Sequence, residues 1–391
     1  MSELLTVEQA VAAVVEHAKP RGKHDVEIGD AFGCVLAEDA RAAVDLPPFD
    51  SSAMDGYAVR SGDSPGALKV VGHSAAGHPA QAVLRGGEAV NISTGAVVPD
   101  GADAVIEIER VQERGDVVVV EGVAEGANVR PRGGDVAAGS VIGQAGTRIA
   151  ATHVGALAAA GVALVSTFER PRVAVLSTGS ELRPPGSALA PGQIYESNSL
   201  LLAAQLRSAG IDADVLGAVR DDEAALRAAL ERGLQADVLL TSGGVSVGPH
   251  DLLKRLFDEL GVQRVFWGVA MRPGKPLYFG VREETLVFGL PGNPVSTLVG
   301  FELFVRTALR ACEGEAAPQP RFVPGRLATP LQRNAQRDEL VRAYAQGGLV
   351  TPVSGQESHM IVRAAAANAL AFIPRGEGSL AAGEHVGYLP V

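Results

Sequence analysis

The chain has 391 residues, is 47% hydrophobic and 20% charged, and carries a formal net charge of -11; this suits roughly two to four packed domains and excludes a disordered chain. No basic surface dominates and no apolar run is long and strong enough to cross a bilayer, so we expect neither nucleic-acid nor membrane binding. Only Cys34 and Cys312 are present, which offers no zinc cluster and no disulfide framework and favours a cytoplasmic protein.

The N-terminal part predicts one helix followed by a small β domain. Thr6-Val-Glu-Gln9 is a capping box, which predicts a helix to about His17 that Pro20 ends. Residues 57–123 alternate short Val-rich runs with Gly, Pro and Asp, a pattern typical of strands joined by tight turns. Residues 146–165 favour a helix and then an extended segment.

From residue 170 onward, predicted strands alternate with predicted helices. Apolar runs predict strands at residues 172–176, 214–219, 237–241, 262–270 and 286–290, and helices are expected from Ser197-Asn198 to about Gly210 and at residues 223–233, 252–260 and 295–312. Such alternation predicts a mostly parallel sheet with helices on both faces. Ligands bind outside the carboxyl ends of such strands, so the loops that follow the strands should meet at one edge. Residues 313–320 are typical of a linker, and residues 321–391 predict a small β-rich domain.

The strongest local signal is the loop Thr241-Ser-Gly-Gly-Val-Ser-Val-Gly248, which precedes Pro249-His250-Asp251. Glycines let backbone N–H groups approach a ligand, and with the neighbouring hydroxyls they would form an anion cradle. Gly243 and Gly248 have Walker A spacing, but Pro249 stands where that motif requires Lys. From the residues alone, a phosphate cradle and an ordinary tight turn are equally good interpretations. Asp251 beside a cradle suggests a divalent metal between them.

The other strand-ending loops also carry charged or hydroxylic side chains. They offer Glu181, Asp221 and Asp251 as acids and Arg272 and Lys275 as bases. Because chance rarely places such a residue in every loop at one sheet edge, we predict a ligand site there. The competing interpretation treats these groups as helix-terminal acids and solvated loop charges. Helix-start chemistry likewise explains a cap residue followed by proline, as at Asn293-Pro294.

Seven motifs carry a resemblance to one family. They are Ser51-Ser-Ala-Met-Asp-Gly-Tyr-Ala58, Ser93-Thr-Gly-Ala96, Arg132-Gly-Gly-Asp135, Ser177-Thr-Gly-Ser-Glu-Leu182, Thr241-Ser-Gly-Gly-Val-Ser-Val-Gly248, Arg272-Pro-Gly-Lys-Pro276 and Leu290-Pro-Gly-Asn-Pro-Val-Ser296. In this order they resemble the molybdopterin molybdenumtransferase family of the MoeA type, which is related to the E domain of gephyrin. The match runs from about Pro47 to Ala369.

The resemblance implies a multidomain α/β plus β protein that forms a homodimer. It implies an elongated discontinuous first domain (1–46 and 136–166), an inserted small β domain (47–135), a molybdopterin-binding-type α/β sandwich (167–314) and a C-terminal β-barrel domain (320–391). It also implies an active site shared between the two subunits.

The activity that the resemblance implies is the insertion of molybdenum from molybdate into adenylylated molybdopterin, with release of AMP and with Mg²⁺ as cofactor. The molybdopterin adenylyltransferase and apo-molybdoenzymes would be its protein partners. Two other functions remain open: the adenylyltransferase itself, which would need only residues 170–313, and a gephyrin-like scaffold. Tungstate in place of molybdate is open as well.

The resemblance also implies roles for individual residues. Catalytic roles fall to Asp55, Thr94, Asp135, Glu181, Asp221 and Asp251, of which Asp221 and Asp251 would hold the metal. Substrate binding falls to Thr241, Ser242, Gly243, Gly244, Ser246, Gly248, Arg272, Lys275, Pro291, Gly292, Asn293, Pro294, Ser296, Arg342 and Ser358. Asp55, Thr94 and Asp135 would reach the cleft from the second subunit.

Two of these site residues have simpler interpretations, and the chain departs from the family pattern at residues 268 and 272. Asp55 precedes Gly56 and would form a turn, and Asp135 would counter neighbouring arginines. Family members often carry Lys where this chain has Gly268, and Arg272 stands where Lys is frequent. The residue that contacts molybdate is therefore left open.

Overall fold

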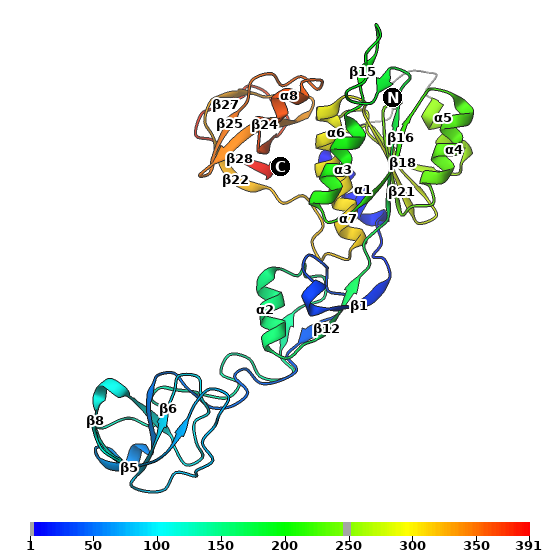
Figure 1. The fold of residues 1–391 in the computed structure, drawn as a ribbon. Coiled ribbons are helices and arrows are strands. Elements are labelled where there is room, and N and C mark those ends of the chain that lie inside the picture. Colours follow the sequence, from blue (N-terminus) through cyan, green and yellow to red (C-terminus); the bar gives the residue numbers. More distant parts are fainter. Residues whose placement is uncertain (1–3, 245–251) are drawn as a thin grey trace. The chain divides into compact units, whose positions relative to one another are not determined.

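The computed structural model describes residues 4–244 and 252–391 of the chain. Contacts divide the chain into two compact units (Figure 1). Unit 1 combines residues 1–24, 33–37 and 168–391, and unit 2 combines residues 25–32 and 38–167.

Unit 1 contains the predicted α/β domain, built on a six-stranded sheet. In spatial order the strands are β16 (Ala213–Val219), β13 (Val173–Thr178), β17 (Val238–Ser242), β21 (Thr285–Leu290), β20 (Tyr278–Arg282) and β18 (Gln263–Trp267). The first four run parallel, which confirms the prediction of a mostly parallel sheet. The sequence did not predict β20, which pairs antiparallel with both of its neighbours.

Alternating side chains of each central strand enter two separate cores. In β13, Val173 and Val175 belong to one buried cluster and Ala174 and Leu176 to the other. Helices α1 (Val7–His17), α3 (Asn198–Ser208), α6 (Pro294–Gly300) and α7 (Arg306–Cys312) cover the first face, and α4 (Glu223–Gly233) and α5 (Leu252–Glu259) cover the second (Figure 1). Helices on both faces explain why these strands are apolar along their whole length.

Local sequence signals set several of these boundaries. The capping box of α1 is confirmed, since the Gln9 N–H donates to Thr6 Oγ1 at 3.1 Å and the Thr6 N–H donates to Gln9 Oε1 at 2.9 Å. The helix expected at 295–312 is helical throughout, but its middle, Phe301–Val305, is a π-helical turn between α6 and α7. The strand expected at 262–270 ends at Trp267, because Gly268 takes a left-handed φ of 92°.

The C-terminal part of unit 1 is a closed five-stranded barrel, as predicted. Its strands are β22 (Val323–Leu327), β24 (Asp338–Gln346), β25 (Leu349–Pro352), β26 (Ala369–Ile373) and β28 (His385–Pro390), and the β24–β26 pairing closes the ring. A short strand from the α/β domain, β19 (Met271–Arg272), pairs with β24 in parallel. The loop that carries Arg272 is therefore hydrogen-bonded into the barrel. The remaining short elements of this unit are β14 (Leu182–Arg183), β15 (Ile194–Tyr195), β23 (Leu331–Gln332), α8 (Ile361–Ala364) and β27 (Ser379–Leu380).

Unit 2 contains the predicted small β domain. Its sheet has the order β7 (Ala104–Glu107), β4 (Gly56–Val59), β6 (Glu88–Ile92), β5 (Gly66–Ser74), β9 (Val117–Val120) and β8 (Val111–Arg114). Both faces are buried, with Tyr57 and Val59 in one cluster and Ala58 in the other. The other elements around this unit are β1 (Lys23–Glu27), β2 (Ala40–Arg41), β3 (Ser51–Ser52), β10 (Val129–Arg130), β11 (Val141–Gly143), α2 (Ala151–Ala159) and β12 (Leu164–Phe168).

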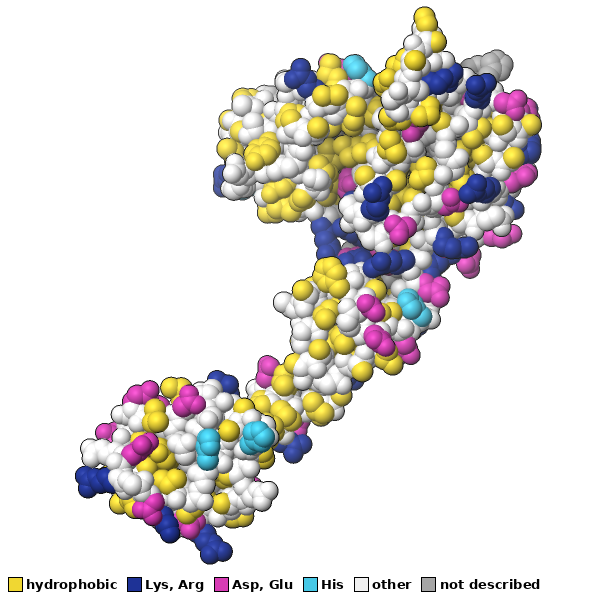
Figure 2. Space-filling model, viewed as in Figure 1, with side chains coloured by type: hydrophobic (Ala, Val, Ile, Leu, Met, Phe, Trp, Pro, Cys, Tyr) yellow, Lys and Arg dark blue, Asp and Glu magenta, His cyan; other side chains and the backbone are white. Residues whose placement is uncertain are grey.

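The surface of unit 1 is mixed in character. On the face shown in Figure 2, acidic and basic side chains are interspersed over the α/β domain, and hydrophobic side chains gather where the barrel borders it. None of the helices within residues 4–244 and 252–391 has the length and apolar character that crossing a bilayer demands.

Candidate active site

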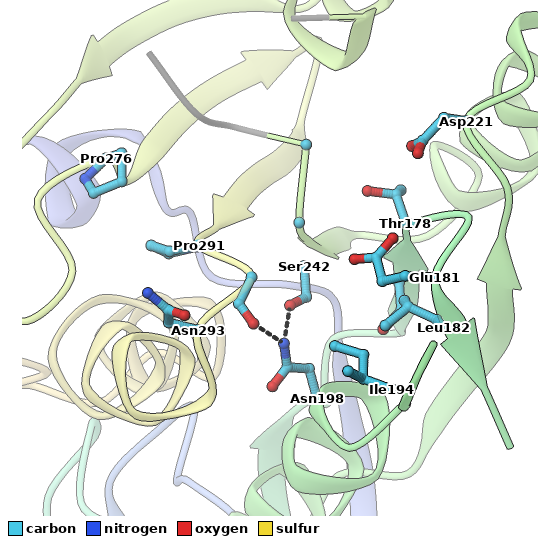
Figure 3. Close-up of a pocket in the computed structure, with 15 residues that line it drawn as sticks. Thr178, Glu181, Leu182, Ile194, Asn198, Asp221, Ser242, Pro276, Pro291 and Asn293 are labelled. Carbon is cyan, nitrogen blue, oxygen red and sulfur yellow. Dashed lines mark hydrogen bonds between the residues drawn. The ribbon is translucent and has the colours of Figure 1, made fainter. Parts of the chain in front are cut away.

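A cavity of about 530 Å³ lies at the carboxyl ends of the parallel strands (Figure 3). Eight residues predicted from the sequence line it: Glu181, Asp221, Ser242, Gly243, Gly244, Pro291, Gly292 and Asn293. Glu181 and Asp221 lie on one side of the cavity, opposite Pro291 and Asn293 (Figure 3). The prediction that the strand-ending loops converge is confirmed for these residues.

The two acids of this cavity follow adjacent strands. Asp221 follows β16, and its carboxylate accepts a hydrogen bond from the Ser180 N–H at 3.2 Å, while its own N–H donates to Ser180 Oγ at 3.1 Å. Glu181 lies in the turn after β13, in which Gly179 takes a φ of 153°. Both carboxylates lie on the same wall of the cavity, and both side chains are exposed to solvent.

The glycines of the predicted cradle are needed for close packing of the loop. Gly243 has a φ of 92°, and a Cβ there would lie 2.5 Å from the Thr178 carbonyl oxygen. Gly244 also takes a left-handed φ, of 65°. Thr241 faces away from the cavity, since it is fully buried and its hydroxyl donates to the Phe288 carbonyl at 3.3 Å. The predicted site residues Ser246, Gly248 and Asp251 lie outside the described residues.

A second cavity, of about 420 Å³, adjoins the first, because Pro276, Pro291 and Asn293 line both. The predicted residues Arg272, Lys275, Ser296 and Ser358 line it, together with Arg337 and His359. Arg272 also forms a salt bridge with Glu339 at 3.2 Å. The first cavity is therefore acidic and the second is predominantly basic.

Arg337 was not predicted from the sequence. It lies on the barrel side of the second cavity. No local sequence pattern predicts that the barrel borders the Arg272–Pro276 loop. The pairing of Met271 with Asp338 in β19 and β24 brings the two segments together, and that pairing is visible only in the fold.

Asn293 corrects one expectation from helix-start chemistry. It stands at the N-cap position of α6, with Pro294 at the first turn, but its side chain makes no capping hydrogen bond. Instead Asn293 Nδ2 donates to Ser358 Oγ at 2.9 Å, and the Val295 N–H donates to the Ser358 carbonyl at 3.2 Å. The side chain therefore joins the α/β domain to the barrel within the wall of the second cavity.

Arg342 does not line either cavity. It is 1% exposed, and its guanidinium donates to the carbonyl oxygens of Met360 at 2.6 Å, Gly355 at 2.5 Å and Glu357 at 3.2 Å. Burial lowers the pKa of this guanidinium from its ordinary value. Within the described structure, Arg342 therefore supports the loop that presents Ser358.

Replacing Arg342 with methionine is expected to destabilise the fold by about 3 kcal/mol, because three partly buried carbonyls lose their donor and a hydrogen bond to a charged group contributes roughly 1.5–3 kcal/mol. Urea unfolding, together with amide exchange of residues 353–360, measures the effect. The control is Arg326→Met, since Arg326 is exposed and its side chain donates only to the Gly383 carbonyl, at 3.4 Å, among the described residues. Equal stability of the two variants would contradict a structural role for Arg342.

Position 268, where the resemblance leads us to expect lysine, is a glycine in a left-handed conformation. Its φ is 92°, and a Cβ there would lie 2.7 Å from the Leu4 side chain. A side chain at this position would therefore be strained. The cationic groups that line the second cavity come from Arg272, Lys275 and Arg337 instead.

The three predicted residues of unit 2 are all exposed. Asp55 and Thr94 are in contact, since the Thr94 N–H donates to Asp55 Oδ1 at 2.8 Å. Asp135 follows β10, and its N–H donates to the Leu46 carbonyl at 2.9 Å. Arg132 pairs with Asp45, with Nε donating to Oδ2 at 2.6 Å, rather than with Asp135.

The donor set at the first cavity suits a hard cation that keeps several waters. The described residues contain no cluster of three or more His, Cys, Asp or Glu side chains arranged for a metal. Two carboxylates on one wall, Glu181 and Asp221, are the kind of partial oxygen ligation that Mg²⁺ accepts when a phosphate supplies further oxygens.

A mostly parallel α/β sheet with two adjoining cavities at the carboxyl ends of its strands has the architecture of a protein that binds a small molecule at that edge. Comparison with known families is more specific. Residues 5–161 match the MoeA N-terminal region (domain I and II), residues 174–311 match the probable molybdopterin binding domain, and residues 324–391 match the MoeA C-terminal region (domain IV).

Known proteins resemble the chain over almost its whole length. It is 39% identical over 376 residues to "Molybdopterin molybdenumtransferase 2" of Mycobacterium tuberculosis, covering 92% of each chain. It is 35% identical over 395 residues to the molybdopterin molybdenumtransferase of Haemophilus influenzae, covering 98% of each. A crystal structure of the molybdopterin biosynthesis MoeA protein of Pyrococcus horikoshii superposes with a TM-score of 0.84 at 33% identity, covering 99% of each chain.

The chain belongs to the MoeA family of molybdopterin molybdenumtransferases. Membership assigns it a transferase role in molybdenum cofactor biosynthesis and accounts for its multidomain fold.

Proposed function

We propose that this protein inserts molybdenum from molybdate into adenylylated molybdopterin, releasing AMP in a Mg²⁺-dependent reaction. The observation that carries the proposal is the pair of adjoining cavities, one acidic and one basic, with Pro276, Pro291 and Asn293 in both walls. The proposed substrate has two ends that correspond to the two cavities. Its pyrophosphate needs a counter-ion, and its dithiolene must lie next to the oxyanion that supplies molybdenum.

The acidic cavity fits the pyrophosphate with its metal. Asp221 and Glu181 would hold Mg²⁺ or orient its waters, and Asp251 is the further predicted ligand. When bound, Mg²⁺ would neutralise charge on the phosphate oxygens and polarise the bond that breaks to release AMP. The backbone of Gly243 and Gly244 would contact those oxygens, since neither residue has a side chain to keep them away.

The basic cavity fits the oxyanion. Molybdate is a dianion, and Arg272 and Lys275 would bind it by a forked hydrogen bond and a point charge, respectively. Ser296 and Ser358 would add hydroxyl donors. We include Arg337 among these residues because it supplies a third cationic side chain to the same cavity, whereas Gly268 supplies none.

The proposal includes a cytoplasmic homodimer. Asp55, Thr94 and Asp135 of unit 2 would complete the site of a second copy of the chain, since all three are exposed and two of them are in contact. The molybdopterin adenylyltransferase, which supplies the substrate, and the apo-molybdoenzymes, which receive the product, would be transient partners.

The experiment that tests the proposal is an assay of AMP release from adenylylated molybdopterin, with and without molybdate and with EDTA as the metal-free arm. We expect AMP release only when molybdate and Mg²⁺ are both present. ATP consumption with free molybdopterin would instead identify an adenylyltransferase. Tight substrate binding without either reaction would favour a scaffold. A parallel arm with tungstate decides which oxyanion is preferred.

A further inference from the structure

The start of α3 joins the ends of three neighbouring strands beside the first cavity. Ser177 of β13 pairs in register with Ser242 of β17, which pairs with Leu290 of β21. Glu196 and Asn198, at the beginning of α3, contact these strand ends or the loop that follows. None of the sequence motifs assigned these two residues a role in the site.

Asn198 donates two hydrogen bonds through one atom. Its Nδ2 donates to Ser242 Oγ at 2.8 Å and to the Gly292 carbonyl oxygen at 2.8 Å (Figure 3). A carbonyl oxygen only accepts, so rotating the amide to place Oδ1 there would set two acceptors against each other. The amide orientation is therefore fixed, and Ser242 Oγ must accept from Asn198.

This arrangement leaves the hydroxyl hydrogen of Ser242 for another acceptor. A serine hydroxyl has one hydrogen and two lone pairs, and Asn198 occupies a lone pair. No acceptor for the hydrogen is found within residues 4–244 and 252–391, although the side chain is 2% exposed and the residue lines the cavity. Ser177 differs, because its hydroxyl donates to Glu196 Oε1 at 2.9 Å.

A buried carboxylate lies two residues before Asn198 and binds the first turn of α3. Glu196 is 7% exposed and accepts from the Ser199 N–H at 2.8 Å and from Ser199 Oγ at 2.5 Å. These bonds fix the first turn of α3 against β13. Ser197 at the N-cap position makes no side-chain capping bond, so Glu196 supplies the acceptor that a cap would otherwise provide.

We propose that Asn198 is a positioning residue that fixes Ser242 as a hydrogen-bond donor to a phosphate oxygen of the substrate. It also holds the Gly292 backbone, so that the end of β17 and the loop after β21 keep their separation beside the cavity. This inference rests on the proposed function, because the phosphate belongs to the adenylylated substrate.

The test is a mutational cycle with two readouts, the KM and kcat of AMP release and the Kd of AMP measured by calorimetry. Ser242→Ala and Asn198→Ala are each expected to raise KM and Kd roughly tenfold to a hundredfold, the worth of a hydrogen bond to a charged group, with a smaller change in kcat. The KM and Kd of the double variant are expected to exceed those of the weaker-binding single variant by at most about threefold. The effects of two residues in one hydrogen-bonded network are not additive.

Asn198→Asp separates positioning from simple packing. Aspartate has the same shape but only accepts, so it would draw the Ser242 hydrogen toward itself and face the Gly292 carbonyl. We expect this variant to bind AMP at least as weakly as Asn198→Ala. The inference would be overturned if Asn198→Asp bound AMP as tightly as the wild type. It would also be overturned if the loss of AMP affinity in the double variant equalled the product of the losses in the two single variants.

The matched control is Gln205→Ala, which removes another α3 amide that donates to two acceptors. Gln205 Nε2 donates to Glu302 Oε1 at 2.8 Å and to the Leu298 carbonyl at 3.4 Å, away from the first cavity. We expect unchanged KM and AMP affinity in this control. The wild type could bind AMP, and the variants could weaken that binding as expected, while no AMP is released from the substrate. In that case the proposed function fails and the role of Asn198 stands. If wild-type protein does not bind AMP, the inference itself is wrong.

Discussion

Replacing Asp221 with asparagine is expected to slow AMP release about a thousandfold while leaving the fold intact. The proposed metal stabilises charge on the phosphoryl group by several kcal/mol, and about 4 kcal/mol corresponds to roughly a thousandfold in rate. Asparagine keeps an oxygen that accepts from the Ser180 N–H, so the local hydrogen bonds survive the change. The measurement is kcat as a function of Mg²⁺ concentration.

The control is the neighbouring acid. Asp222 caps α4, with its side chain accepting from the Ala225 N–H at 2.9 Å, and asparagine is an equally good cap. Asp222→Asn is therefore expected to keep wild-type turnover and Mg²⁺ dependence. Comparable activity in both variants would remove Asp221 from the metal site.

Mixing two inactive variants is expected to restore activity if the site is shared between subunits. Asp55→Asn alters unit 2 and Asp221→Asn alters unit 1, and each homodimer should be nearly inactive. Random pairing of equal amounts makes half of the dimers mixed, and each mixed dimer has one intact site of two, so roughly a quarter of the wild-type rate should return. The measurement is AMP release after co-expression or after unfolding and refolding together.

The matched control for this experiment pairs two variants of unit 1. Glu181→Gln and Asp221→Asn both alter the first cavity, so every site of their mixed dimer carries one lesion, and no recovery is expected. Recovery in both mixtures, or in neither, would argue against a site made from unit 1 of one subunit and unit 2 of the other.

The strand-end acids were predictable because two rules act together. Glycine-rich turns after apolar runs are local signals, and parallel strands place their carboxyl ends at one edge. These rules place Glu181, Asp221 and Ser242 in one cavity without further knowledge, and the structure agrees.

The roles of Asn198 and Arg342 were not predictable from local patterns. The partners of Asn198 lie 44 and 94 residues away in sequence, and asparagine at a helix start is ordinarily explained by capping. Arg342 was expected to bind substrate only because the family resemblance implied that role. Only the packed barrel reveals that backbone carbonyls of a loop surround its guanidinium.

The short pairing of β19 with β24 has a consequence for engineering. The segment with Arg272 is covalently part of one domain but takes its strand partner from the next. An excised α/β domain would therefore lose the support of its cationic loop, and its first core would lose the barrel residues Leu340, Leu370 and Leu389. Chimeras between relatives should exchange this segment and the barrel as a single module.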